Sequence, residues 1–377
     1  MYGGLSKHIR TIKMVKGLTE ISKHVLTVAP QFKNHRGGIG AVIASYAIHI
    51  RDFKFVATYD GRYGVIRNIA FFVLSLLRVT WKLSTDRSIK IVHIHGASKG
   101  SFLRKYLIFL MAKFLFRKKV IYHLHGGKFH LFYENSNFII RFLIRHLSEC
   151  VDVFICLSTY WQIYLSKEFD IRNLTVVNNP VSLAPRPYHI YEDSKEEILN
   201  MLFLGRIGDT KGIFDLLDVI KTYRQEWEGK IKLKIGGDGE VNRLKNYIET
   251  HCLSSIVEYI GWADGDKKHE LLSRCNVLVL PSYNEGLPIS ILEAMSYGKG
   301  IISTTVGGIP EVVKHQENGF LITPGDFDGL AEAIDRLVQS PQLRKAIGET
   351  SKRRVEPYLI ENVLIQLNSI YSYESMD

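Results

Sequence analysis

Short, almost purely apolar segments recur through the second half of the chain, and each of them ends in a turn rich in glycine or charge. With their turns, these segments are residues 201–212, 276–285 and 301–311, and a further expected strand at 234–240 ends in a glycine-rich turn. Unbroken apolar runs are typical of strands that are buried on both faces of a parallel sheet. The pattern predicts an α/β fold, in which ligands bind just beyond the carboxyl ends of the strands.

Two glutamates eight residues apart, Glu285 and Glu293, follow the apolar run 276–281 in the sequence E-G-L-P-I-S-I-L-E. Pro288 suits the first turn of a helix, and Glu293 then lies about 7 Å further along it. Because the amino-terminal end of a helix attracts anions, the motif predicts a phosphate site there. The backbone amides expected to bind it are those of Gly286, Leu287 and Ile289. The alternative is a solvated turn glutamate and a glutamate that only complements the helix dipole.

The neighbouring strand ends carry cations and glycines. Arg206 follows Gly205 at the end of one run, Lys211 lies in the loop after it, and Gly237 belongs to the turn that ends another. Ordinary surface charge is the alternative explanation for the two cations. Cations, amides and carboxylates at several strand ends are nevertheless hard to explain by packing alone, so we expect one shared site.

These motifs, together with the V-G-G-I-P-E turn at 306–311, resemble the retaining glycosyltransferases of family 4, or glycosyl transferases group 1. The resemblance implies the GT-B fold: two facing Rossmann-like domains, a deep cleft between them and a carboxyl-terminal helix that crosses back. It implies that Arg206 and Lys211 bind the donor diphosphate and that Glu293 binds the ribose hydroxyls. Glu285, with the backbone of 286–289, would contact the transferred sugar and a phosphate. Gly205 and Gly237 would approach the donor closely.

The leaving nucleoside diphosphate gains negative charge in the transition state, which preorganised cations stabilise. The resemblance implies a metal-independent enzyme of the hexosyltransferase type, with no cofactor beyond its nucleotide-sugar co-substrate. We expect a UDP-sugar because such donors are common.

The expected domains are an amino-terminal acceptor domain over residues 1–185, a nucleotide-sugar domain over 195–355 and a returning helix over 356–377. Prolines near residues 180–187 mark the linker between the first two. Residues 1–22 are an extension with no assigned role.

Histidines and glycines mark the strand ends of the amino half. The loop before the helix 41–49 contains Arg36, Gly37 and Gly38, and by resemblance Gly38 lies near the donor. Two strands end in H-I-H-G at 93–96 and H-L-H-G-G at 123–127, with each histidine pair on one strand face. Such pairs can bind a metal ion, but no carboxylate or cysteine completes the set nearby, so we expect no metal here. His125 matches the family's histidine that faces the transferred sugar.

Charge divides the chain. Residues 1–190 carry 28 Lys and Arg against 9 Asp and Glu, whereas the remainder carries 21 against 29. No acidic residue occurs between Asp86 and Glu134, where residues 99–119 form a basic, aromatic segment of helical length. This segment could be a crossover helix, a surface for an anionic bilayer, or both, and residues 62–82 could extend that surface. No nucleic-acid motif is present.

The sequence thus predicts a cytoplasmic glycosyltransferase, peripherally bound to the inner face of the plasma membrane. It would act on a lipid-linked or growing glycan in cell-surface polysaccharide biosynthesis. The alternatives are a non-catalytic sugar-nucleotide or glycan-binding module at the membrane and a GT-B sugar-nucleotide epimerase. Four cysteines without metal or disulfide spacing are expected to be buried thiols of a reducing compartment.

Overall fold

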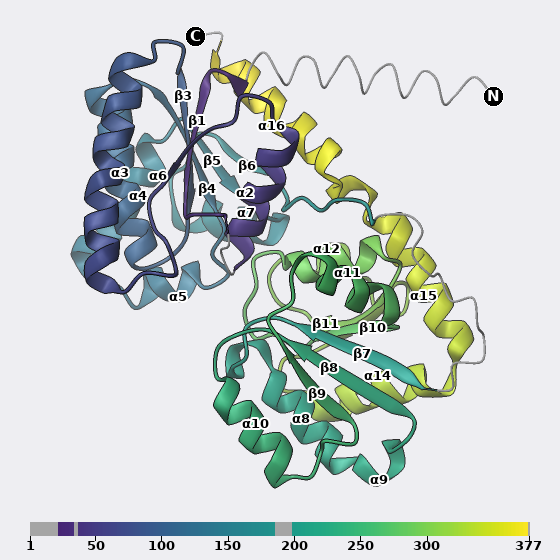
Figure 1. Cartoon of the computed structure of the whole chain (residues 1–377). Helices are drawn as coiled ribbons and strands as arrows, with labels where there is room; N and C mark the ends of the chain where they lie inside the picture. The colour runs from purple at the N-terminus through teal and green to yellow at the C-terminus, as the bar shows by residue number, and fades with distance from the viewer. Residues whose placement is uncertain (1–21, 34–36, 185–197, 376–377) are drawn as a thin grey trace, which may run out of the picture. The chain divides into compact units, whose positions relative to one another are not determined.

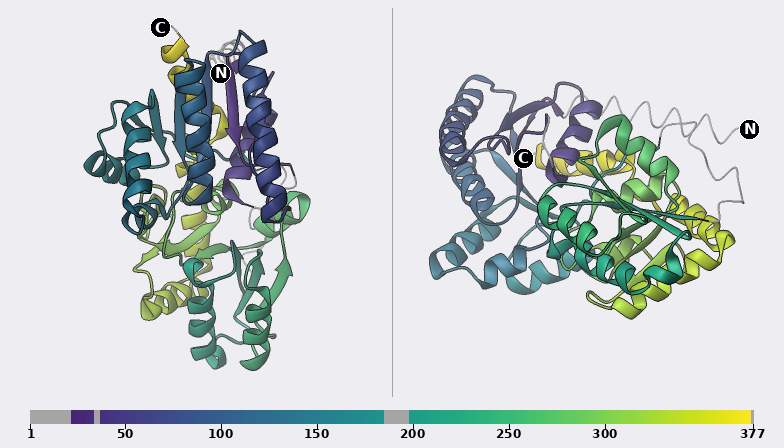
Figure 2. Two further views of the ribbon diagram at one scale, coloured as in Figure 1. Left: turned by 90° about the vertical axis from the view of Figure 1, so that its left-hand side faces the viewer. Right: turned by 60° about the horizontal axis from the view of Figure 1, so that its bottom comes forward.

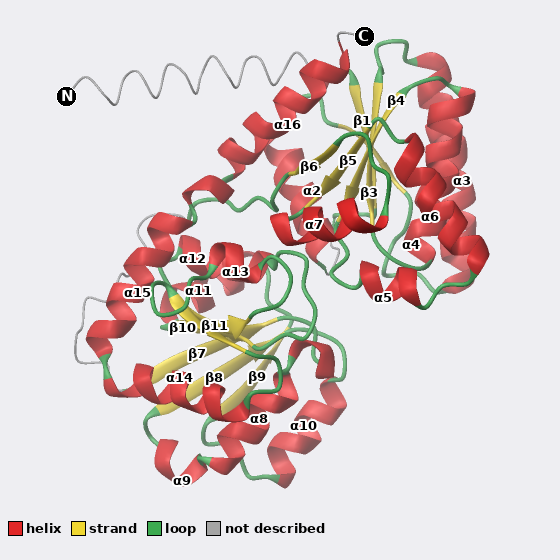
Figure 3. Ribbon diagram, turned by 180° about the vertical axis from the view of Figure 1, so that it is seen from behind, coloured by secondary structure: helices red, strands yellow, loops and turns green. Residues whose placement is uncertain are grey.

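The computed structural model describes residues 22–33, 37–184 and 198–375. Two compact units divide the chain: unit 1 comprises residues 1–180 and 360–377, and unit 2 comprises residues 181–359 (Figure 1). Each unit contains a six-stranded parallel sheet with helices on both faces (Figures 2 and 3). The predicted α/β fold with two parallel-sheet domains is confirmed.

The sheet of unit 1 has the strand order β2-β1-β3-β4-β5-β6. Its strands are β1 (Val25–Ala29), β2 (Lys54–Ala57), β3 (Ile91–Gly96), β4 (Lys119–Leu124), β5 (Val153–Cys156) and β6 (Leu174–Val176). Its helices are α2 (Gly38–His49), α3 (Val65–Thr85), α4 (Gly100–Leu110), α5 (Phe129–Glu134), α6 (Phe138–Cys150), α7 (Thr159–Glu168) and α16 (Ile360–Ser375). A π-helical turn, Met111–Leu115, continues α4.

Alternating side chains give the two faces of this sheet different environments. Val92 and Ile94 of β3 join the apolar core that also contains residues of α3, α4 and α6. His93 and His95 point to the other face, where His93 bonds to Tyr371 of α16 and His95 contacts Tyr46 of α2. The carboxyl-terminal helix therefore packs on the sheet of the amino-terminal unit.

The sheet of unit 2 has the order β12-β11-β10-β7-β8-β9. Its strands are β7 (Leu199–Leu204), β8 (Ile231–Gly236), β9 (Val257–Gly261), β10 (Val277–Leu280), β11 (Gly300–Thr304) and β12 (Gly319–Ile322). Its helices are α8 (Ile213–Thr222), α9 (Arg224–Trp227), α10 (Val241–Thr250), α11 (Gly265–Arg274), α12 (Ile289–Ser296), α13 (Ile309–Val312), α14 (Phe327–Gln339) and α15 (Pro341–Arg354). Strand β10 lies between β7 and β11, so the loops after these three strands meet at one edge.

Several expectations fall on residues outside the described ones: the extension before residue 22, Arg36, and most of the linker after Pro180. Of the cysteines, Cys156 and Cys275 are buried, whereas Cys150 is half-buried and Cys252 is exposed. The expectation of four buried thiols is therefore wrong, because Cys252 lies in the turn after α10 rather than in the apolar core. None of the helices among the described residues is both long and apolar enough to cross a membrane.

Candidate functional site

Glu285 lies at the centre of the site on unit 2, in the loop between β10 and α12. Its side chain is buried and accepts a hydrogen bond of 2.8 Å from the Ser282 hydroxyl. The Lys211 ammonium, from the loop after β7, forms an ion pair with the same carboxylate. The structure thus joins two residues that are 74 positions apart in the sequence. Ser282 was not among the predicted site residues, although it lies only three residues before Glu285.

The loop that carries Glu285 fits closely against the V-G-G-I-P-E turn. Gly307 has φ +55°, and a Cβ atom there would lie 2.1 Å from the Glu285 carbonyl oxygen. The Gly308 amide donates to the Gly286 carbonyl over 2.7 Å. Glycine is required at 307 because any side chain would displace the backbone of the site. Helix α12 begins at Ile289, so Pro288 is the residue before its first turn rather than a member of that turn.

Lys211 is placed by a second close approach between loops. Residues Asp209–Lys211 form a 3-10 turn that ends at Gly212, which has φ +66°. A Cβ atom at Gly212 would lie 2.0 Å from the Pro281 carbonyl oxygen. The amide of Tyr283 also donates to the Thr210 carbonyl over 3.1 Å. The loops after β7 and β10 therefore pack backbone to backbone, which holds Lys211 beside Glu285.

The glycines of the two other strand ends also meet. A Cβ atom at Gly237 would lie 1.8 Å from the carbonyl oxygen of Gly205. Arg206, which follows Gly205 in the sequence, is exposed and makes no ion pair with a described residue. Its guanidinium is therefore available to an anionic ligand, but the structure does not bring it into contact with Lys211 or Glu285.

Glu293 has a partner that the sequence did not suggest. The Lys268 ammonium, from α11, lies 2.5 Å from its carboxylate, and both side chains are largely covered. Lys268 belongs to a charged, exposed helix whose spacing gives no sign of this contact. The ion pair neutralises Glu293 and fixes its orientation on α12.

Gly38 and His125 lie on unit 1, where Gly38 is the first residue of α2. His125 follows β4, and its Nε2 lies 2.8 Å from Nδ1 of His95 in a hydrogen bond. A second hydrogen bond joins its side chain to Asn179. Burial lowers the pKa of His125 to about 3, an effect that Asn179 only partly opposes. His125 is therefore a neutral imidazole that neighbours hold in place.

The strand register gathers three histidines beneath α16. His95 lies directly opposite His123, so both histidine pairs share one sheet face. The ring nitrogens of His93, His95 and His123 lie within 4.8 Å of one another, and all three side chains are buried. Burial lowers the pKa of each of them, which keeps the rings neutral. Three imidazoles are a donor set that Zn²⁺ accepts. The sequence showed these histidines as two pairs, one on each strand, and did not predict that the pairs lie together.

The comparisons with known proteins agree with this architecture. Residues 191–354 match the model of the family described as glycosyl transferases group 1. An uncharacterized glycosyltransferase of Methanocaldococcus jannaschii is 26% identical over 380 residues, which cover 98% of this chain and 94% of that protein.

Two solved structures share the fold. Sucrose-phosphate synthase from Thermosynechococcus elongatus has a TM-score of 0.75 at 17% identity, over 94% of this chain and 99% of that one. HepE of Anabaena in complex with UDP-glucose has a TM-score of 0.72 at 19% identity, over 93% and 99%. The fold is GT-B, and the findings support a glycosyltransferase. The residues around Glu285 all lie within the matched region.

Proposed function

We propose that the chain is a retaining glycosyltransferase of family 4, which transfers a sugar from a UDP-sugar to a lipid-linked or growing glycan. The contact between Lys211, Glu285 and Ser282 at the start of α12 carries the proposal. A buried carboxylate holds a cation at a helix amino terminus, where a phosphate also binds favourably. The close backbone contacts of Gly212 and Gly307 hold this ion pair in one position, which is expected of a binding site and not of an ordinary surface ion pair.

In this proposal the donor diphosphate lies at the amino terminus of α12. Lys211 and the exposed Arg206 stabilise the negative charge that develops on the leaving group. Glu293, oriented by Lys268, accepts hydrogen bonds from the ribose hydroxyls. No protein group acts as base, because the leaving phosphate accepts the proton of the acceptor hydroxyl. No metal takes part in this step.

Neutral His125 is the group of unit 1 that we assign to the transferred sugar. Its contacts with His95 and Asn179 orient the ring, and its low pKa means that it binds as a hydrogen-bonding group rather than as a cation. The choice of a uridine donor is supported by the UDP-glucose complex of HepE, a protein of the same fold.

We also propose that unit 1 binds the cytoplasmic face of an anionic membrane, as an enzyme of cell-surface polysaccharide biosynthesis would. Helix α3 exposes an apolar stripe, which we call the α3 stripe: Ile66, Ile69, Val73, Leu77 and Trp81. The helix contains three basic residues and no acidic ones. Apolar and basic residues together are the features of a helix that lies on an anionic bilayer.

Helix α4, which the sequence favoured for this role, is mostly covered. Phe102, Lys105, Tyr106, Ile108 and Phe109 are buried, whereas only Leu103 and Leu107 of its large apolar residues are exposed. It packs between α3 and α6, so it acts chiefly as a crossover helix. The π-helical turn that continues α4 exposes Phe114 and Leu115, so residues 99–119 keep a part of the proposed membrane surface and α3 provides the larger part.

Vesicle flotation tests the membrane proposal. The protein should float with vesicles that contain phosphatidylglycerol but not with vesicles of phosphatidylcholine alone. Leu77→Glu should abolish flotation, whereas Ile163→Glu, at a similarly exposed apolar residue of α7, should not. Two results would contradict the assignment to α3: an equal loss of flotation in both variants, or a wild-type protein that does not float with the phosphatidylglycerol vesicles.

Thermal-shift measurements with UDP-, GDP-, ADP- and dTDP-sugars test the donor proposal. A ligand at about 100 times its Kd stabilises the native state by about 2.7 kcal/mol. One nucleotide sugar should stabilise the wild type and should have no effect on Glu293→Ala.

The reaction products separate the alternatives. Donor binding without slow hydrolysis or transfer would indicate a non-catalytic module, and epimer formation without an acceptor would indicate an epimerase. A transfer product with inverted anomeric configuration would refute the retaining mechanism.

A further inference from the structure

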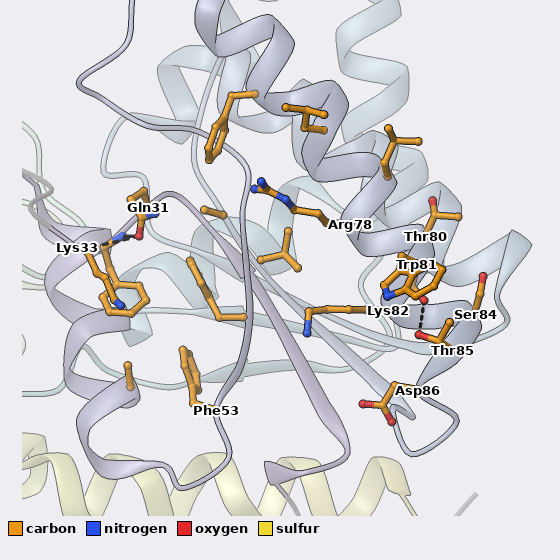
Figure 4. Close-up of a pocket in the computed structure, with 18 of the residues that line it drawn as sticks. Gln31, Lys33, Phe53, Arg78, Thr80, Trp81, Lys82, Ser84, Thr85 and Asp86 are labelled. Carbon is orange, nitrogen blue, oxygen red and sulfur yellow. Dashed lines mark hydrogen bonds between the residues drawn. The ribbon is translucent and has the colours of Figure 1, made fainter.

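A large groove on unit 1 lies outside the site described above. Its volume is about 1440 Å³, and it runs along β2, an edge strand of the described sheet, between helices α2 and α3 (Figure 4). That volume is above the range of about 300–1,000 Å³ typical of small-molecule sites. The groove is therefore large enough for an extended ligand.

The groove is lined mainly by apolar and aromatic side chains. Helix α2 contributes small residues, Ala44 and Ala47, which leave the space open. Strand β2 and the residue before it contribute Phe55 and Phe53, whose rings stack with centroids 6.0 Å apart. Helix α3 contributes Phe71, Leu74, Leu77, Arg78, Trp81, Lys82 and Thr85, among other residues. From Phe71 to Thr85 the helix rises about 21 Å, which exceeds the thickness of one leaflet of a bilayer core, about 15 Å.

Cations occur among these apolar residues. Lys33, Arg78 and Lys82 line the groove, and Figure 4 shows Arg78 and Lys82 reaching from α3 toward the space between the helices. Among the described residues that line the groove, Asp86 alone is acidic, and it is bound by Lys54 over 2.5 Å and by the Ser88 hydroxyl. The groove therefore has an excess of positive charge, which favours a ligand with an apolar chain and an anionic head.

The position of the groove agrees with such a ligand. Its wall on α3 includes Leu77 and Trp81, which also belong to the α3 stripe. A chain could thus enter the groove from a membrane bound to that stripe. At its other end, Gln31 and Lys33 follow β1, whose carboxyl end lies at the same sheet edge as His125.

We infer that the groove binds the hydrocarbon chain of an isoprenoid or acyl phosphate, with the phosphate held by Arg78 and by Lys82, one helical turn away on α3. The ligand class is that of a lipid-linked acceptor, so the biological meaning of the site rests on the proposed function. The binding measurement itself does not depend on the proposed function, because it requires no sugar transfer.

Equilibrium dialysis with radiolabelled farnesyl phosphate, below its micelle concentration, tests the inference on the full chain. We expect one molecule per chain and at least tenfold weaker binding of farnesol. Ala47→Trp fills the groove without removing a contact and should reduce binding at least tenfold. Ala346→Trp, at an exposed position of α15, should bind as the wild type does. Arg78→Met should remove the preference for the phosphate over the alcohol.

Each other outcome overturns the inference. Absence of farnesyl phosphate binding, or binding that Ala47→Trp leaves unchanged, means that the groove does not hold the chain. Binding only to vesicles means that the α3 stripe alone contacts lipid, and a dimer that Ala47→Trp dissociates means that a second copy occupies the groove. Thermal shifts by UDP-sugars in the same samples report on the proposed function separately.

Discussion

Replacing Gly307 by alanine should disable the donor site through the backbone alone. The residue has φ +55°, where an alanine costs about 1–2 kcal/mol relative to its usual conformation. The new Cβ atom would also lie 2.1 Å from the Glu285 carbonyl oxygen, so the two loops must separate by roughly 1 Å. Such a shift in a packed region costs typically about 1–3 kcal/mol more.

The two terms together predict a loss of about 2–5 kcal/mol from the free energy of unfolding. For a unit of this size, about 1 kcal/mol lowers Tm by about 2–4 °C. Turnover should fall further than stability suggests, because a displacement of about 1 Å near the reacting groups can reduce the rate by about 100-fold. Circular dichroism melting and single-turnover transfer from the donor measure the two effects.

Gly229→Ala is the matched control. Gly229 has φ +78°, yet a Cβ atom there meets nothing within 4 Å. This variant carries the backbone strain without the collision, so it should lose about 1–2 kcal/mol and keep wild-type turnover. If Gly307→Ala binds the donor and turns it over as well as Gly229→Ala does, then the 306–308 turn does not support the donor site.

Three further predictions concern Lys211, Lys105 and the removal of metal ions. Lys211→Met should lower turnover at least 100-fold with the fold intact. The control Lys221→Met, at an exposed ion pair on α8, should not lower it. Near-normal turnover of both variants would contradict the role of Lys211. Burial lowers the pKa of Lys105 from 10.5 to about 7, so the unfolded chain binds more protons between these values and stability rises with pH there. Lys105→Met should therefore flatten the rise of Tm between pH 7.5 and 9.5, and an unchanged slope would show that Lys105 is not its cause. Dialysis against EDTA should leave turnover unchanged; a loss that Zn²⁺ restores in the wild type but not in His93→Gln would instead reveal a metal at the histidine cluster.

The strand ends could be predicted closely because burial on both faces leaves a clear pattern. The run expected at 276–281 contains β10, Val277–Leu280, and the loop after it does carry Glu285. The sequence of residues 99–119 fits two structures, because an apolar helix with basic residues can be a buried crossover or a lipid-facing surface. Lys105 illustrates the difficulty: it is fully buried and bonds to the Thr58 hydroxyl, although its residue type suggests solvent.

The partners of the site residues could not be read from the chain. Lys268 pairs with Glu293 because α11 and α12 pack with those side chains toward each other, and no local spacing encodes that contact. His123 joins His93 and His95 in the cluster because the strand register sets it opposite His95. A shift of one residue would have placed His123 on the other face of the sheet.

The sequence by itself determined the α/β class, the strand ends that carry the site and the opposite charges of the two halves, because hydrophobic periodicity, turn residues and charge are local properties. The tertiary structure alone decided that Lys211 meets Glu285, that Gly307 and Gly212 permit this through contacts with distant carbonyl oxygens, and that α3 exposes more large apolar side chains than α4 does. These features depend on packing between segments far apart in the chain, and that packing is fixed only when the sheets assemble.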